Sequence, residues 1–151
     1  MAVYTSTPVT LGQQGPSGGW FGVLKCYTAS VTTTAAVTTA DTLNLLTMPK
    51  NSVIWGFECK ATQFDTNGAP TLAWNIGDAG LATRLFTATT VGRTATPQWK
   101  NETDATATNT GVGYQFPADT VIVAVPQANP ATGAAGTFTL NVYYTLVGGP
   151  S

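Results

Sequence analysis

The sequence predicts an all-β protein with a single antiparallel β-sandwich or jelly roll of about eight short strands. The clearest evidence is residues 137–147, where Phe138, Leu140, Val142, Tyr144 and Leu146 alternate with polar residues. Side chains alternate between the two faces of a strand, so this pattern indicates one buried face and one polar face. Turn-forming residues separate the other β-rich segments, and no segment has a useful helical period.

The same criteria predict the remaining strands in order. They are expected at residues 20–34, 41–47, 53–62, 71–77, 81–90, 108–116 and 120–125. In 53–62, Val53, Trp55, Phe57, Cys59 and Ala61 are expected to face inward, as are Leu72, Trp74 and Ile76 in 71–77. Asp-Thr-Asn-Gly at 65–68 is typical of a hairpin turn, so 53–77 is predicted to be one β-hairpin. Residues 91–106 are expected to form a long, exposed connection.

Residues 1–19 are predicted to form an extended N-terminal arm before a β-sandwich domain at 20–151. No charged residue precedes Lys25, and Pro and Gly interrupt the segment. Two interpretations remain open: an arm lying on a neighbouring molecule, or a segment that is folded on its own domain or partly frayed. The candidate partner-binding residues are Val3, Tyr4, Val9, Leu11 and Trp20.

The composition excludes several classes of function. Only 9% of the residues are charged and the net charge is −1, so no basic surface is expected for nucleic acid. There is neither an apolar run long enough to cross a membrane nor a signal-peptide pattern at the N-terminus. A low-charge surface suits contact with protein neighbours, although many Thr-rich β-proteins share it. Cys26 and Cys59 leave a disulfide open, but two free, buried thiols are favoured.

No catalytic, metal or cofactor site is predicted, and the protein is not expected to be an enzyme. Histidine is absent, which removes the usual base for serine or cysteine nucleophiles and the commonest metal ligand. The acidic pairs Asp65 with Asp78 and Glu102 with Asp104 lie in predicted turns or loops, where carboxylates are ordinary. Residues 65–68 lack the later acidic ligands of a calcium loop.

One candidate function is a carbohydrate-binding β-sandwich module, associated with a tail or fibre or with an enzyme. It would require exposed aromatic side chains on which sugar rings can stack. Trp20, Trp99 and Tyr114 are the only candidates. The competing interpretation is that Trp20 and Trp99 cover an end of the sandwich.

Residues 41–90 resemble the decoration, or head cementing, proteins of tailed bacteriophages. The similarity rests on a short strand, a Pro49-Lys50-Asn51 turn, a long strand, Gly77-Asp78, and Arg84 followed by an aromatic at Phe86. The resemblance implies a jelly-roll protein, made in the host cytoplasm, that binds the major capsid protein on the outer surface of the virion. It implies head stabilisation, a homo-oligomer that is favoured to be a trimer, and no catalytic residues.

Overall fold

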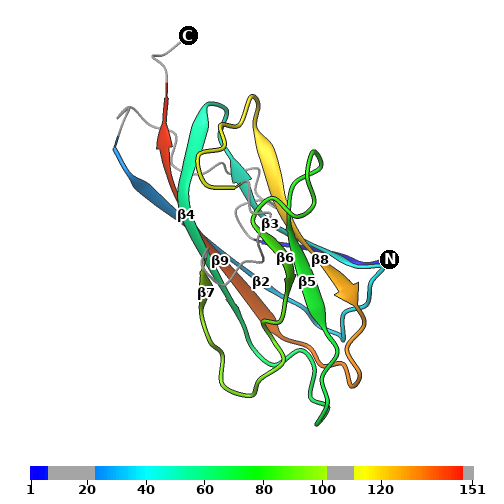
Figure 1. Cartoon of the computed structure of the whole chain (residues 1–151). Helices are drawn as coiled ribbons and strands as arrows, with labels where there is room; N and C mark the ends of the chain where they lie inside the picture. Colours follow the sequence, from blue (N-terminus) through cyan, green and yellow to red (C-terminus); the bar gives the residue numbers. More distant parts are fainter. Residues whose placement is uncertain (7–22, 102–110, 148–151) are drawn as a thin grey trace.

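The computed structural model describes residues 1–6, 23–101 and 111–147, and these residues contain nine strands and no helix. The strands are β1 (Val3–Thr5), β2 (Lys25–Thr32), β3 (Thr42–Met48), β4 (Ser52–Ala61), β5 (Ala73–Gly77), β6 (Phe86–Thr89), β7 (Lys100–Asn101), β8 (Thr120–Ala128) and β9 (Thr137–Leu146). They form one sheet in the order β1-β3-β8-β5-β6 and another in the order β2-β9-β4-β7 (Figure 1). The prediction of an all-β sandwich of the jelly-roll kind is therefore confirmed.

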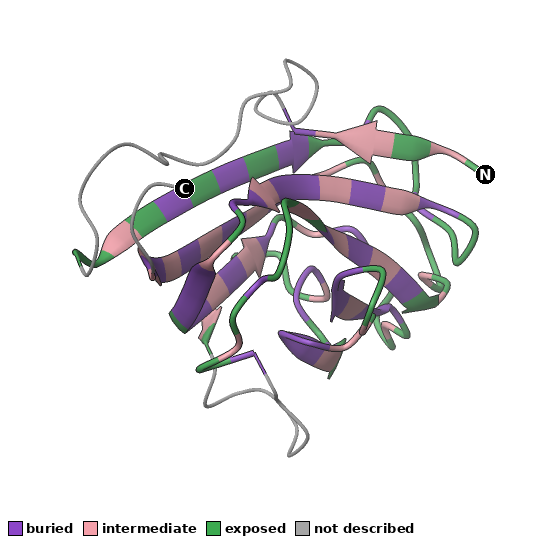
Figure 2. Cartoon of the chain, turned by 90° about the horizontal axis from the view of Figure 1, so that it is seen from above, coloured by how far each residue is buried: buried purple, intermediate pink, exposed green. Residues whose placement is uncertain are grey.

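The core lies between the inner faces of the two sheets. β9 occupies the interior of the four-stranded sheet, and its five predicted inward residues are all buried. Buried and less buried residues alternate along the strands, as Figure 2 shows. Aromatic rings connect the sheets: Phe57 of β4 and Phe86 of β6 meet edge to face with centroids 5.0 Å apart. Trp74 of β5 is fully buried against Phe138 of β9, as its predicted inward position requires.

The prediction that Trp55 faces the core is wrong. The pairing of β4 with β9 shifts between Ile54 and Gly56, so one extra residue is inserted at this point. Ile54 is consequently buried, Trp55 points outward with 55% of its surface exposed, and Phe57 returns to the core. Val53, which pairs with the outward Thr145, also lies on the outer side of the sheet although little of it is exposed, so its predicted inward direction is wrong as well. A bulge reverses the alternation of side chains along a strand, and Gly56 is the type of residue that often marks one.

The predicted hairpin over 53–77 is also wrong. β4 belongs to the four-stranded sheet and β5 to the five-stranded sheet, so residues 62–72 cross from one layer to the other. The side chain of Asp65 explains the difference. It is buried and accepts backbone hydrogen bonds from other loop residues, instead of capping a two-strand turn.

Three other segments differ from their predictions. The strand expected at 81–90 is only β6, because residues before Phe86 form the turn after Gly77. Residues 111–116 make one isolated bridge, between Gln115 and Val53, and no strand. The connection at 91–106 begins with buried Val91 and includes β7.

The first six residues lie on their own chain. β1 pairs in parallel with β3, and the backbone nitrogen of Ser6 donates to the carbonyl of Asn44 at 2.8 Å. Val3 is exposed, whereas Tyr4 packs against the core. The other candidate arm residues, Val9, Leu11 and Trp20, lie outside the described residues.

Candidate protein-binding surface

The outer face of the four-stranded sheet is a nearly neutral surface, which we call the Trp55 face. It comprises the outward side chains of three neighbouring strands. These are Cys26, Thr28, Ser30 and Thr32 of β2; Thr137, Thr139, Asn141, Tyr143 and Thr145 of β9; and Trp55, Glu58 and Lys60 of β4. Glu58 and Lys60 are the only charged side chains among these twelve residues.

Trp55 is the large apolar side chain of this face. Its indole Nε1 donates a hydrogen bond of 2.8 Å to Oγ1 of Thr145 on the adjacent strand. The indole therefore has its polar group satisfied while its ring remains exposed. Leu24, which is 59% exposed, directly precedes β2, and the β2–β9 register places it beside Thr145. Tryptophan is enriched among protein-binding hot spots, so the exposed ring of Trp55 is the candidate anchor of this face, and Leu24 adds apolar surface on the other side of Thr145.

The negative charge of Glu58 is satisfied within the same face. Its Oε1 accepts hydrogen bonds of 2.8 Å from both Nδ2 of Asn141 and the hydroxyl of Tyr143. The hydrogen bond to Glu58, followed by burial, raises the pKa of Tyr143 to about 12. Hydroxyl pairs between β2 and β9, such as Ser30 with Thr139 at 2.9 Å, satisfy further polar groups. Oδ1 of Asn141 is buried without a hydrogen-bond partner in the described residues, whereas the polar groups named above are already paired before a partner covers them.

The positive charge of Lys60 also has a partner, because its Nζ lies 4.6 Å from the ring centroid of Trp99. Trp99 is 43% exposed, at the β7 side of the sheet. Tyr114 is distant from it, since the backbone of Tyr114 bonds Ile54, six residues before Lys60 along β4. Six residues of extended strand span about 20 Å. The two described candidates for sugar stacking therefore do not form one platform, and Trp20 lies outside the described residues.

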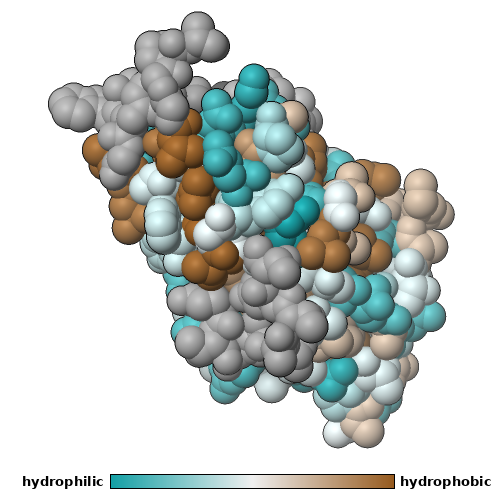
Figure 3. Space-filling view, turned by 45° about the horizontal axis from the view of Figure 1, so that its top comes forward, coloured by the Kyte–Doolittle hydropathy of each residue, from teal (hydrophilic) through white to brown (hydrophobic). Residues whose placement is uncertain are grey.

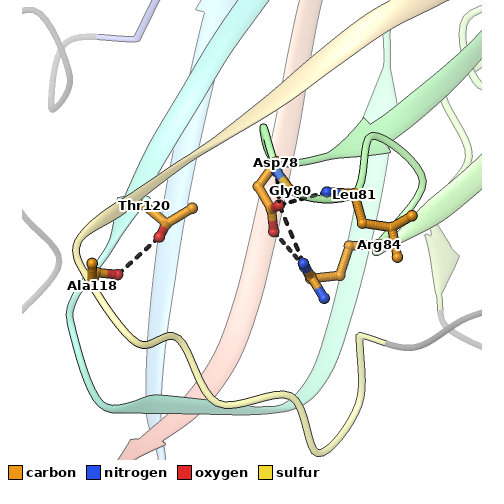
Figure 4. A network of polar contacts seen from close by, with 6 residues as sticks. All are labelled: Asp78, Gly80, Leu81, Arg84, Ala118 and Thr120. Carbon is orange, nitrogen blue, oxygen red and sulfur yellow. Dashed lines mark hydrogen bonds and ion pairs between the residues drawn. The ribbon is translucent and has the colours of Figure 1, made fainter.

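A hollow of about 750 Å³ lies on the outer face of the five-stranded sheet. Its lining includes Asn44, Asp78, Tyr114, Pro117, Val121 and Val123. Asp78 is held by a salt bridge to Arg84 and by the backbone nitrogens of Gly80 and Leu81 at 2.8 and 2.9 Å (Figure 4). Burial opposes ionisation of Asp78, but these donors hold its pKa below the ordinary value. Its carboxylate is thus already engaged.

The predicted candidates for chemistry are not brought together. Asp65 is buried at the opposite end of β5 from Asp78, and backbone nitrogens occupy its oxygens. Glu102 and Asp104 lie outside the described residues. Within 1–6, 23–101 and 111–147, no three Cys, Asp or Glu side chains are grouped to hold a metal ion. Neither cysteine forms a disulfide. Cys59 is buried as predicted, but Cys26 is exposed, which corrects the prediction that both are buried.

The described part of the chain has no helix that is long and apolar enough to cross a membrane. On the side of the molecule shown in Figure 3, apolar residues form several separate groups among polar residues. Trp55 was missed by sequence reasoning because strict alternation assigned it to the core. The available signal was Gly56, a glycine inside a strand pattern.

The described residues thus form a β-sandwich with a nearly neutral outer face, on which most of the polar side chains are hydrogen-bonded to one another. No protein-family model and no curated protein sequence matches the chain. Two solved structures are similar. A chain of the cyanophage Pam1 capsid asymmetric unit is 32% identical, with a TM-score of 0.74 over 88% of this chain and 91% of that one.

The second similar structure is a chain of the capsid of Ralstonia phage GP4, with 22% identity and a TM-score of 0.78. It covers 97% of this chain and 99% of the GP4 chain, and it shows that the fold is shared. The chain belongs to the family of phage capsid-associated proteins that the Pam1 chain represents. It is a structural protein of a phage virion, associated with the capsid.

Proposed function

We propose that the chain is a capsid decoration protein, which binds the outer surface of the assembled capsid and stabilises the head. The observation that carries this proposal is the 32% identity to a Pam1 capsid chain over 88% of the sequence. The resemblance of residues 41–90 to head cementing proteins supports the same role. In this proposal the partner is the major capsid protein, and the protein is made in the host cytoplasm before it binds the virion.

The Trp55 face is the proposed capsid-binding surface. Moving a charged group out of water is costly unless it is paired, and both charged side chains of this face already have partners. The hydroxyl groups that pair between β2 and β9 are already hydrogen-bonded, which lowers the cost of moving these polar groups out of water. Trp55 and Leu24 supply apolar surface, whose burial contributes about 25 cal/mol per Å².

A homotrimer is the proposed oligomeric state. Modest contacts made by each subunit become strong when linked subunits bind a repeating lattice at the same time. The N-terminal residues Val3, Tyr4, Val9, Leu11 and Trp20 are proposed to add partner contacts. Val3 has an exposed side chain next to the β3 edge, which is consistent with this role.

The experiment measures binding of the purified protein to capsids of the source phage that lack it. Wild-type protein is expected to bind and to raise the temperature at which the capsids disrupt. Trp55→Ala is expected to weaken binding by about 30-fold, the loss typical of a hot-spot residue worth about 2 kcal/mol. Its unfolding free energy should change by less than about 1 kcal/mol, because the indole is exposed.

Val121→Ala is the control, because it removes an exposed apolar side chain from the outer face of the other sheet, away from the Trp55 face. It is expected to bind nearly as well as the wild type. Equal binding by Trp55→Ala and the wild type would contradict the role of the Trp55 face. No binding by the wild-type protein would contradict the decoration function itself.

A further inference from the structure

β2 is a long strand at the edge of its sheet. In the order β2-β9-β4-β7 it stands last, and among the described strands it pairs with β9 alone. It has eight residues, whereas the other edge strands, β1, β6 and β7, have three, four and two. Proteins usually keep edge strands short or protect them, because an open edge can pair with another chain.

The backbone groups that face this open side can be assigned from the register. The β2–β9 pairing continues to Thr33, whose nitrogen donates to the carbonyl of Gly136 at 2.8 Å. In an antiparallel pair, alternate residues bond the partner strand, so the odd-numbered residues of β2 bond β9. The N–H and C=O groups of Cys26, Thr28 and Ser30 therefore point away from β9. Within the described ranges, no backbone group pairs with them.

The side chains of these three residues would not obstruct an incoming strand. All three are exposed, and they are small and uncharged. No charged residue or proline occurs from Cys26 to Thr32, although these are the usual devices that protect an edge. The same side chains belong to the Trp55 face, so a protein seated on that face also reaches the open edge.

We infer that β2 receives an extended, uncharged segment of the capsid protein as an added strand. Backbone hydrogen bonds would supply the binding, as in other cases of β-strand addition. The segment would alternate small polar residues, beside Thr28 and Ser30, with apolar residues that extend the row of Tyr27, Ala29 and Val31. A charged residue there would lose its hydration without a partner.

A second copy of β2 is a less suitable occupant. Two identical edges pair antiparallel only across a two-fold axis, and the proposed trimer has no such axis. The inference rests on the proposed decoration function, because it names the segment of the chain through which the capsid is held. It adds the prediction that the backbone at the edge of β2 becomes hydrogen-bonded on the capsid, which docking of the Trp55 face alone would not require.

Residue-resolved hydrogen exchange tests the inference on the full-length protein, free and bound to source-phage capsids that lack it. In the free protein, the amides of Thr28 and Ser30 should exchange rapidly, whereas those of Ala29 and Val31 should be slow. On the capsid, the amides of Thr28 and Ser30 should slow by at least about tenfold. If the amides of Thr28 and Ser30 already exchange slowly in the free protein, whether it is monomeric or self-associated, the inference would be overturned.

Ser30→Pro gives a second measurement, since it removes an N–H that faces the open side and leaves the β9 ladder intact. It is expected to bind capsids at least about tenfold more weakly than Ser30→Ala, which loses the same hydroxyl pair with Thr139 but keeps the N–H. Wild-type binding without protection of Thr28 and Ser30 would overturn strand addition alone. Absence of wild-type binding would overturn both the inference and the decoration function.

Discussion

The carboxylate of Asp65 accepts a hydrogen bond of 3.1 Å from the backbone nitrogen of Thr132, 67 residues later in the sequence. The same buried carboxylate accepts bonds from Ala131 at 3.0 Å and from Thr71 and Leu72 at 2.8 and 3.1 Å. Asp65 therefore joins the connection between β4 and β5 to the loop before β9. This position gives an acidic residue without catalytic partners a clear structural role.

Asp65→Asn is expected to lower the free energy of unfolding by at least about 3 kcal/mol. An amide has one acceptor oxygen where the carboxylate has two, and its NH2 group would face backbone donors. Urea denaturation at pH 7 measures the effect. Asp119→Asn is the control, because Asp119 also accepts a backbone hydrogen bond, from Lys50, but at an exposed position. A loss no larger than that of the control would contradict the structural role of Asp65.

Stability should fall as the solution is acidified below about pH 4. Burial opposes ionisation of Asp65, but four backbone donors lower its pKa from 3.8. A carboxyl whose pKa is lower in the folded state adds stability above its unfolded pKa, and this stability is lost as pH falls through the folded pKa. The measurement is the unfolding free energy between pH 7 and pH 2. In Asp65→Asn the unfolding free energy should fall less steeply with decreasing pH than in the wild type. An equal slope in the two proteins would contradict this prediction.

Gly77→Ala is expected to destabilise the protein by at least about 2 kcal/mol. A Cβ atom at Gly77 would lie 2.2 Å from the carbonyl oxygen of Leu81 and 2.5 Å from the carbonyl carbon of Ala82. Both are backbone atoms of the turn after β5, so neither can rotate away. Gly68→Ala is the matched control, because nothing lies within 4 Å of its added Cβ. Thermal unfolding compares the two variants, and equal melting temperatures would contradict the packing described for Gly77.

One thiol per chain should react rapidly with a thiol reagent under native conditions. Cys26 is exposed on β2, whereas the side chain of Cys59 is fully buried between the sheets. The second thiol should react only after denaturation. Cys26→Ser should abolish the fast reaction, and a fast reaction that persists in this variant would show that Cys59 is accessible.

Local patterns predicted β9, β8 and the fold class because alternation and turn residues are properties of short segments. The bulge at Trp55 was missed because the choice between strict alternation and an inserted residue depends on pairing with β9. The hairpin was assigned wrongly because the residues that favour a tight turn also suit a crossing loop. The partners of Asp65 at Ala131 and Thr132 are distant in sequence, so no local pattern reveals them.

The candidate surface was predicted in character but not in detail. The shortage of charged residues indicated a neutral surface, and the polar outward side of β9 indicated where part of it lies. The residue that stands out on it, Trp55, had been assigned to the core. The pairing of Glu58 with Asn141 and Tyr143 depends on strand register, which the sequence of β4 alone does not specify.

The position of β9 between β2 and β4 has a consequence for how the chain is made. β2 and β4 do not pair with each other, so they can be joined into one sheet only by β9, which is synthesised much later. The Thr32–Thr137 pair alone spans 105 residues. Such distant pairings slow folding and leave strands exposed on a nascent chain. A truncated translation product that stops before β9 lacks Thr145 and the completed sheet, so only fully translated copies would be competent to join a virion.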